Sequence, residues 1–176
     1  KKSIIFRPHN IYGPDMGWEH VIPEFMKRIK KISSSTKETT VKFPIQGTGD
    51  ETRAFCYIDD AVAGTIGAME SSKAAGEIYH IGKQDEINME TLTTYIGGLM
   101  GYSGAYEAAM TYPGSVARRC PNIDKAIADF GYSPNIDWKT AVSLTTDWYR
   151  EFFNSGQHPQ AGGFETPEAV MAKVAK

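Results

Sequence analysis

The sequence predicts an α/β fold built around one principal domain. Short apolar runs bounded by glycine or proline alternate with longer segments whose apolar side chains recur at helical spacing. The 176 residues, 41% hydrophobic and 23% charged, are enough for one ordinary globular core. A Gly-x-Gly turn at residues 47–49 leads through an arginine into a strand and then a helix, which sets a cation beside a tight turn.

The overall charge and the cysteine content argue against several classes of function. A net charge of −2 gives no positive surface for nucleic acid or an anionic membrane. Cys56 and Cys120 are too few for a disulfide framework and lack metal-ligand spacing, which favours a reducing cytoplasm. No apolar run approaches the ~20 residues that span a bilayer, and residues 1–6 lead into a strand rather than a signal peptide. We therefore expect a cytoplasmic protein without a metal site, and the missing initiator methionine agrees with a partial chain.

The first expected element is a short apolar strand at residues 3–7. Pro8 ends it, because proline cannot donate a hydrogen bond to a strand ladder. Residues 9–18 form a loop rich in glycine, proline, asparagine and aspartate at the carboxyl end of this strand, where open α/β sheets bind ligands. Asn10 in this loop could read a sugar hydroxyl or position the backbone through its amide, and the alternative is an ordinary turn asparagine.

An amphipathic helix is expected at residues 19–32. Its apolar side chains fall at helical spacing, and Pro23 is tolerated only in the first turn, which places the helix start near His20. The opposite face is basic, and we expect its four side chains to be solvated: Lys27, Arg28, Lys30 and Lys31.

A polar loop at residues 33–40 and a strand at 41–45 lead to the central stretch of the chain. Gly47 and Gly49 permit a tight turn and the close approach of a ligand to the backbone. Arg53 follows, and its planar guanidinium suits bidentate contact with phosphate.

The central stretch then continues into a strand and a helix. Residues 55–58 are typical of a short strand, and Asp59 or Asp60 is expected to cap a helix over residues 61–69. Taken alone, the pattern is equally compatible with a surface hairpin that carries a solvated arginine.

The C-terminal part continues the alternation of strands and helices. We expect a strand at 76–82, a helix at 89–100 capped by Asn88 and ended by Gly101, a strand at 107–111, a helix at 124–130 closed by Gly131, a helix from 138 capped by Asp137, and a short terminal helix from Thr166.

Tyr79 and Lys83 spell Tyr-x-x-x-Lys, but residues four apart on a strand are separated by ~13 Å. We therefore reject this pair as catalytic.

Three segments together resemble one enzyme family. Residues 6–14 resemble the R-P-x-N-x-Y-G-P segment of the extended short-chain dehydrogenases, residues 47–60 their G-x-G-x-x-T-R-x-F-x-Y-x-D-D segment, and residues 113–124 their P-G-x-x-x-R-x-x-x-D-I segment. The family contains the NAD(P)-dependent nucleotide-sugar epimerases, dehydratases and decarboxylases. The resemblance runs from about residue 3 to residue 153. The chain shows neither the family's N-terminal G-x-x-G-x-x-G loop nor its catalytic Tyr-x-x-x-Lys in the family's place.

The resemblance implies the C-terminal part of a Rossmann-type extended short-chain dehydrogenase. Residues 1–153 would hold the last strands of its sheet and a small mixed α/β substrate-binding lobe, and residues 154–176 a polar tail. NAD or NADP would be bound mainly by an N-terminal Rossmann half of the same protein, and the complete enzyme would be a homodimer. Its substrate would be a nucleotide-diphosphate sugar, oxidised transiently by the cofactor. Because the catalytic pair is expected outside this chain, the chain alone would be inactive.

The resemblance also assigns a substrate site. Arg53 and Arg119 would clamp the diphosphate, with register favouring Arg119 over Arg118 and solvated arginines as the alternative. His20 and Val21 would contact the diphosphate through backbone N–H groups at the helix start. The remaining assignments are Asn10 near the substrate, Pro44 and Gln46 at the nucleotide base, and His80 where the family carries an asparagine near the sugar. The alternative for His80 is a structural histidine on a strand. Gln46 replaces an aromatic residue of many relatives, which leaves hydrogen bonding rather than stacking at the base.

Two other functions stay open at this point. One is a non-catalytic nucleotide-sugar-binding or regulatory module of the same fold, which the sequence upstream of Lys1 would distinguish from an enzyme. The other is an interaction domain that uses the helix over residues 138–153, which would require the apolar face of that helix to be exposed.

Overall fold

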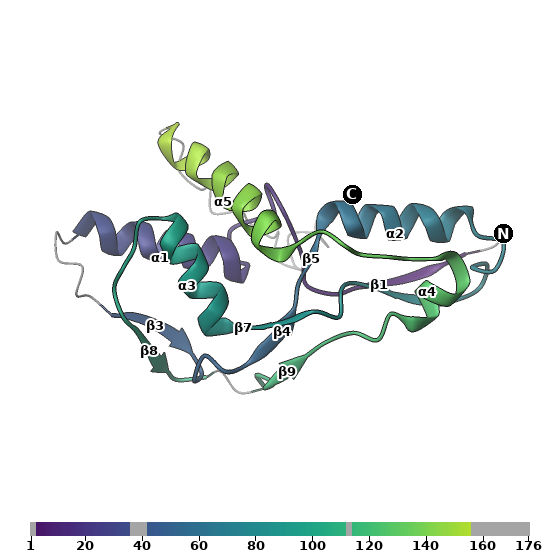
Figure 1. The fold of residues 1–176 in the computed structure, drawn as a ribbon, viewed down its shortest axis with the longest axis horizontal. Coiled ribbons are helices and arrows are strands. Elements are labelled where there is room, and N and C mark those ends of the chain that lie inside the picture. The colour runs from purple at the N-terminus through teal and green to yellow at the C-terminus, as the bar shows by residue number, and fades with distance from the viewer. Residues whose placement is uncertain (1–2, 36–41, 112–113, 156–176) are drawn as a thin grey trace, which may run out of the picture.

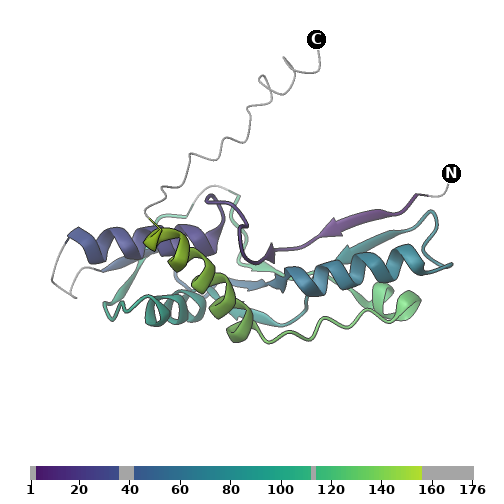
Figure 2. The same cartoon turned by 90° about the horizontal axis from the view of Figure 1, so that it is seen from above.

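The computed structural model describes residues 3–35, 42–111 and 114–155. It shows an elongated α/β molecule with helices and small sheets at both ends (Figure 1). Figure 2, seen from above, places α1 and α5 at one end and α2 and α4 at the other. None of the helices within these ranges is both long and apolar enough to cross a membrane.

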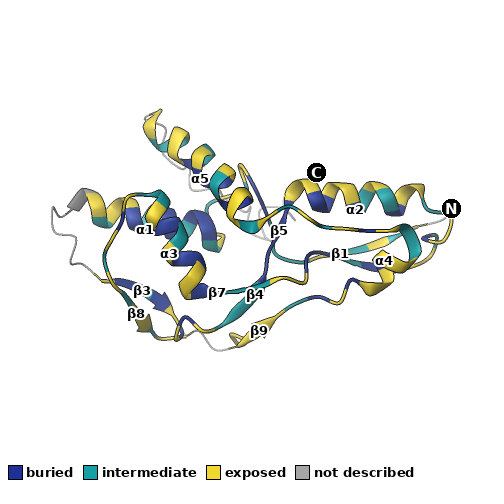
Figure 3. Cartoon of the chain, in the orientation of Figure 1, coloured by how far each residue is buried: buried dark blue, intermediate teal, exposed yellow. Residues whose placement is uncertain are grey.

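One end of the molecule is a pair of parallel strands packed with two helices. Strand β1 (Ile5–Pro8) pairs with β6 (Ile78–Ile81), and helices α2 (Ile58–Glu70) and α4 (Asp124–Phe130) complete this end. Their buried residues form one apolar cluster: Cys56, Ala61, Ala68, Ala74, Tyr79, Ile81, Ile123, Ala126 and Tyr132. Helix α2 has many exposed positions (Figure 3), and several of them are large apolar residues: Ile58, Val62, Ile66 and Met69.

The other end holds three helices and a second parallel pair of strands. Helices α1 (Val21–Ser35), α3 (Met89–Leu99) and α5 (Trp138–Asn154) pack with β3 (Phe43–Gln46), which pairs with β8 (Tyr106–Ala109). The core lies between them because each helix turns one apolar stripe inward, as α1 does with residues that include Ile22, Met26 and Ile29.

A small mixed sheet joins the two ends and carries the central arginine. Strand β4 (Thr52–Ala54) is its middle strand, antiparallel to β7 (Glu86–Asn88) and parallel to β9 (Arg118–Arg119). A shorter parallel pair is formed by β2 (Ile11–Tyr12) and β5 (Cys56–Tyr57). Strand β5 connects β4 to α2 along the chain, whereas β2 follows β1.

The locally determined elements agree with the sequence prediction. Helix α4 has the predicted bounds, and Gly131 closes it in the left-handed region at φ 70°. Asn88 caps α3 by accepting a hydrogen bond from the Thr91 N–H, and Asp137 caps α5 in the same way through the Thr140 N–H.

The predicted cap of α2 is wrong. Tyr57 occupies the N-cap position without a side-chain hydrogen bond, because the helix begins at Ile58, before either acid. Asp59 and Asp60 therefore lie in the first turn. Asp60 is buried and accepts hydrogen bonds from the backbone N–H groups of Asn135 and Ile136, at 3.2 and 3.1 Å.

Other boundaries differ more modestly. Helix α1 continues to Ser35, into the predicted loop, and strands β2, β4, β7 and β9 lie where no strand was predicted. The start of the predicted strand at residue 41 and the predicted helix from Thr166 lie outside the described residues.

The apolar face of α5 is packed into the core. Ala141, Val142, Thr145 and Tyr149 are all at most 1% exposed. The interaction-domain hypothesis required this face to be exposed, so the structure contradicts it.

Candidate functional site

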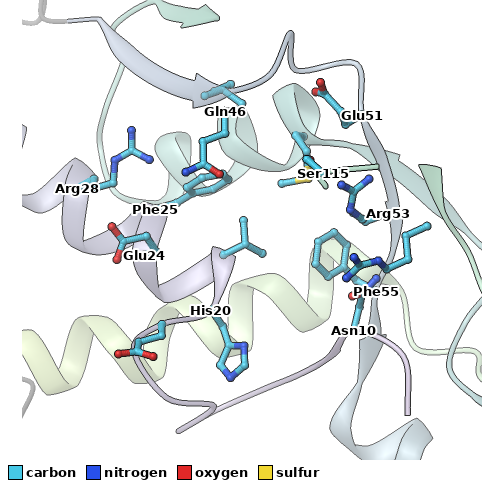
Figure 4. Close-up of a pocket in the computed structure, with 15 residues that line it drawn as sticks. Asn10, His20, Glu24, Phe25, Arg28, Gln46, Glu51, Arg53, Phe55 and Ser115 are labelled. Atoms are coloured by element: carbon cyan, nitrogen blue, oxygen red, sulfur yellow. The ribbon is translucent and has the colours of Figure 1, made fainter. Parts of the chain in front are cut away.

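A pocket of about 470 Å³ opens between the start of α1, the end of β3 and the sheet that contains β4 and β9 (Figure 4). A volume of this size is typical of small-molecule sites. Six of the eight residues predicted from the sequence line it: Asn10, His20, Val21, Gln46, Arg53 and Arg119.

The other two predicted residues do not line this pocket. Pro44 lies in an adjoining groove, next to Gln46 and Arg28. His80, on β6, contacts His9 through their ring nitrogens at 2.5 Å. Burial lowers the pKa of His9, and the neighbouring His80 lowers it further.

Arg53 is held in place by backbone carbonyl groups. Its Nη1 donates to the carbonyls of Thr52 at 2.7 Å and Ala117 at 3.3 Å, and its Nη2 donates to the carbonyl of Val116 at 2.7 Å. These bonds use three of its five N–H donors. Nε and the second Nη2 hydrogen have no partner in the hydrogen bonds of the described residues, so this edge can meet a ligand.

Arg53 and Arg119 lie side by side on paired strands. They are direct register partners in the parallel pair of β4 and β9, and both line the pocket. Burial lowers the pKa of Arg53, and the positive charge of Arg119 lowers it further. The Glu51 carboxylate acts in the opposite direction on the pKa of Arg53 and partly offsets the repulsion between the two guanidinium groups, which an anionic ligand would offset further.

Arg118 has a different partner. Its guanidinium forms an ion pair with Glu86 at 2.6 Å, and Nε also donates to that carboxylate at 3.0 Å. This ion pair raises the pKa of Arg118 and lowers the pKa of Glu86. Because successive side chains on a strand point to opposite faces, Arg119 lines the pocket while Arg118 does not.

The Gly-x-Gly turn is stabilised by an acid that the sequence reading did not single out. Gly47 and Gly49 have φ values of 86° and 94°, which side-chain-bearing residues rarely adopt. The Glu51 carboxylate accepts hydrogen bonds from the N–H groups of Thr48 at 3.1 Å and Gly49 at 3.0 Å. A hydrogen bond from its own backbone N–H is the largest cause of the lowered pKa of Glu51. In the sequence, the position of Glu51 two residues after Gly49 was the signal from which this stabilisation of the turn could have been predicted.

Arg28 is a second feature that the sequence reading missed. It was expected to be solvated, but its guanidinium lies 4.4 Å from the centre of the Phe43 ring, donates to the Pro44 carbonyl and lines the pocket. Glu24, one helical turn earlier, also lines the pocket and pairs with Lys27 at 2.7 Å. Helical spacing places Arg28 on the polar face of α1, so it could not predict that Arg28 lines a pocket.

Asn10 positions the backbone of the pocket wall. Its Nδ2 donates to the Ala54 carbonyl at 2.9 Å, and its φ of 44° is in the left-handed region that asparagine tolerates. This bond ties the loop after β1 to strand β4 beside Arg53. It matches the positioning role rather than the hydroxyl-reading role considered from the sequence.

The Tyr79 and Lys83 side chains contact different parts of the protein. The Tyr79 hydroxyl donates to Asp129 at 2.7 Å, whereas the Lys83 ammonium donates to the Ile136 carbonyl at 2.7 Å. Tyr79 lies on strand β6, as the sequence predicts, and the two side chains do not contact each other's partners. Among the described residues, no group of three or more histidine, cysteine, aspartate or glutamate side chains could hold a metal ion.

Comparison with known proteins gives the family. The sequence model of the NAD dependent epimerase/dehydratase family matches residues 2–82. A UDP-N-acetyl-alpha-D-glucosaminuronate decarboxylase from Bacillus cytotoxicus is 31% identical over 159 residues, which cover 85% of this chain and 47% of that protein. A dTDP-D-glucose 4,6-dehydratase from Bos taurus is 29% identical over 163 residues, which cover 89% and 43%. The chain belongs to the NAD-dependent epimerase/dehydratase family.

Solved structures of the family show the same fold. The UDP-glucuronic acid 4-epimerase of Bacillus cereus, in complex with UDP-glucuronic acid and NAD, matches this chain with a TM-score of 0.72 at 25% identity. The match covers 85% of this chain and 45% of that chain. The chain thus spans less than half the length of these epimerase/dehydratase relatives and has the α/β fold of the corresponding part of a Rossmann-type enzyme.

Proposed function

We propose that residues 1–153 are the substrate-recognition part of an NAD(P)-dependent nucleotide-sugar epimerase or 4,6-dehydratase. In this role the pocket grips the diphosphate of the nucleotide sugar. The observation that carries the proposal is the pair of arginines, Arg53 and Arg119, held as register partners on neighbouring strands and facing one pocket.

The arginine pair suits a diphosphate for two reasons. A diphosphate brings negative charges that offset the mutual repulsion of the two guanidinium groups, and its oxygens accept charge-assisted hydrogen bonds. The three carbonyl contacts of Arg53 also fix its direction before a ligand arrives, so it loses little freedom on binding. His20 and Val21 add the start of α1, where backbone N–H groups and the helix dipole favour an anion.

We assign the hydride chemistry to another part of the enzyme. The pocket brings together arginine, carboxylate and amide groups, which recognise phosphates and hydroxyls, and the Tyr79 and Lys83 side chains do not share a site. NAD or NADP, when bound, would accept a hydride from the sugar and return it. The role of this chain is then to hold the sugar ring against that cofactor.

Titration calorimetry on the full-length protein tests this proposal. Charge-assisted hydrogen bonds contribute roughly 1.5–3 kcal/mol each, so Arg53→Ala should weaken nucleotide-sugar binding by about ten- to a hundredfold. Affinity for NAD(P) should hardly change. Arg53→Lys should restore only part of the loss, because an ammonium group cannot form the bidentate contact.

Arg118→Ala is the matched control. It removes the neighbouring arginine, whose partner is Glu86 outside the pocket, and should leave nucleotide-sugar affinity nearly unchanged. If Arg53→Ala bound the nucleotide sugar normally, or lost the sugar and the cofactor equally, Arg53 would be a structural residue and the proposal would be wrong.

A further inference from the structure

The pocket has two ends with different chemistry. Figure 4 shows Arg53 beside Phe55 and Asn10 on one side, and Arg28 and Glu24 on the other, with Gln46 reaching in above Phe25. We call Arg53 and Arg119 the clamp end, and Glu24, Arg28 and Gln46 the base end. If the clamp end holds the diphosphate, the base end faces the nucleoside.

Two of the base-end side chains, Arg28 and Glu24, contact neighbouring groups of the protein. Arg28 is held over the Phe43 ring and uses one of its five N–H donors on the Pro44 carbonyl. Glu24 projects from the first turn of α1, where Lys27 pairs with it. Phe25 and Ile45 are nearly buried and give this part of the pocket an apolar wall, against which a flat ring can lie.

This combination of charges selects among nucleobases. An ionised carboxylate only accepts hydrogen bonds, whereas a guanidinium only donates them. Guanine meets both demands, because N1–H and the N2 amino group are adjacent donors while O6 and N7 are adjacent acceptors on the neighbouring edge. Uracil and thymine present a single N3–H between two carbonyl oxygens, which a carboxylate repels. Adenine and cytosine each offer only one amino group to the acid.

We propose that the base end recognises guanine, so that the nucleotide carried by the substrate is guanosine diphosphate. Glu24 accepts from N1–H and N2–H, Arg28 donates to the O6 and N7 edge, and Gln46 supplies a further polar contact. The inference rests on the proposed function, because it takes the clamp end as the diphosphate site. The dTDP- and UDP-named relatives differ in their nucleotide, so family membership leaves the base open.

Calorimetric titration of the full-length protein with GDP, IDP, UDP, dTDP, CDP and ADP tests the inference. A bidentate arginine–guanine contact discriminates by roughly five- to a hundredfold, and we expect GDP to bind more tightly than each other base by such a factor. IDP lacks only the N2 amino group and should bind more weakly than GDP. Glu24→Gln should reduce the GDP-to-IDP ratio towards one.

Two further variants separate recognition from structure. Glu107→Gln makes the same change on the exposed surface of β8, outside the pocket, and should keep the wild-type GDP-to-IDP ratio. Arg28→Lys should lower GDP affinity while leaving UDP affinity unchanged. An equal loss for all nucleotides in Arg28→Lys would make Arg28 a structural support of Pro44 and overturn its assigned role.

The outcomes for the inference and for the proposed function are distinct. If UDP or dTDP bound as tightly as GDP while Arg53→Ala weakened every nucleotide, the guanine assignment would be wrong and the diphosphate clamp would stand. If no nucleoside diphosphate bound at all, both would be wrong.

Discussion

Asp60→Ala should be the most destabilising single change among the first-turn residues of α2. The Asp60 carboxylate is 6% exposed and accepts hydrogen bonds from the N–H groups of Asn135 and Ile136 at 3.2 and 3.1 Å. Hydrogen bonds to a charged group contribute roughly 1.5–3 kcal/mol, and these two lie at the long end of the normal range, so we take about 1–2 kcal/mol for each. The variant also leaves two N–H groups without their acceptor. We therefore expect a loss of about 2–4 kcal/mol in the free energy of unfolding.

Urea unfolding of the full-length protein, followed by circular dichroism, measures this loss. Asp59→Ala is the matched control, because Asp59 is an exposed acid in the same turn and contributes through the helix dipole only about 0.3–1 kcal/mol. The slope of the unfolding free energy against urea should be the same in both variants. If Asp60→Ala were no less stable than Asp59→Ala, the two backbone bonds would contribute nothing, and the account of how α2 is tied to the segment before α5 would be refuted.

Three other outcomes can be measured on the same protein. Gly64→Ala should lower the free energy of unfolding by roughly 1–3 kcal/mol, because a Cβ there would lie 2.6 Å from the Tyr132 ring. Gly98→Ala is the control: its Cβ would meet nothing within 4 Å, so it should stabilise α3 by up to about 1 kcal/mol. A stabilising Gly64→Ala would contradict the close packing of α2 against Tyr132. Lowering the pH from 7 through 6.5 should reduce the free energy of unfolding, because the pKa of His9 is lower in the folded than in the unfolded protein. The stability linked to His9 is complete above the unfolded pKa of 6.5 and is lost as the pH falls towards the folded pKa. In denaturation at a series of pH values, His9→Gln should flatten this pH dependence, and an unchanged slope in the variant would refute the assignment to His9. The 176-residue chain alone should self-associate or melt without cooperativity at micromolar concentration, because apolar residues such as Ile5 and Met69 are 54% and 69% exposed; sedimentation of a cooperatively melting monomer would count against this.

The sequence was informative where structure is decided within a few residues. The caps at Asn88 and Asp137 each satisfy an N–H three residues later, and the left-handed Gly131 ends α4, so local chemistry alone sets these boundaries. Strands β7 and β9 are two or three residues long and exist because β4 lies between them. A run that short has no measurable alternation, so no pattern in the sequence could predict it.

In the candidate site, too, the features set by local sequence could be predicted and those set by distant segments could not. Arg53 stands in a recognisable segment, and the structure places it in the pocket. Arg28 was read as part of a solvated face, because helical spacing says which side chains avoid the core but not which neighbouring strand covers the polar side. From the sequence alone, the adjacent acids Asp59 and Asp60 are equally good candidates for the N-cap of α2. The start of the helix at Ile58 and the distant segment at Asn135 decide which of them is buried.

The pairing of β4 with β9 links ligand binding to the folded state of the protein. Arg53 and the Ala117 carbonyl that orients it are 64 positions apart along the chain, so the arginine pair does not exist until this distant pairing forms. In the proposed function, a diphosphate bridging the pair would act as a removable cross-link between the two segments, present only in the folded state. At a concentration one hundred times its dissociation constant, such a ligand adds about 2.7 kcal/mol to the stability of the protein. The supply of substrate in the cell would then set how much of a weakened variant stays folded, and substrate starvation would first deplete the variants whose sheet is already compromised.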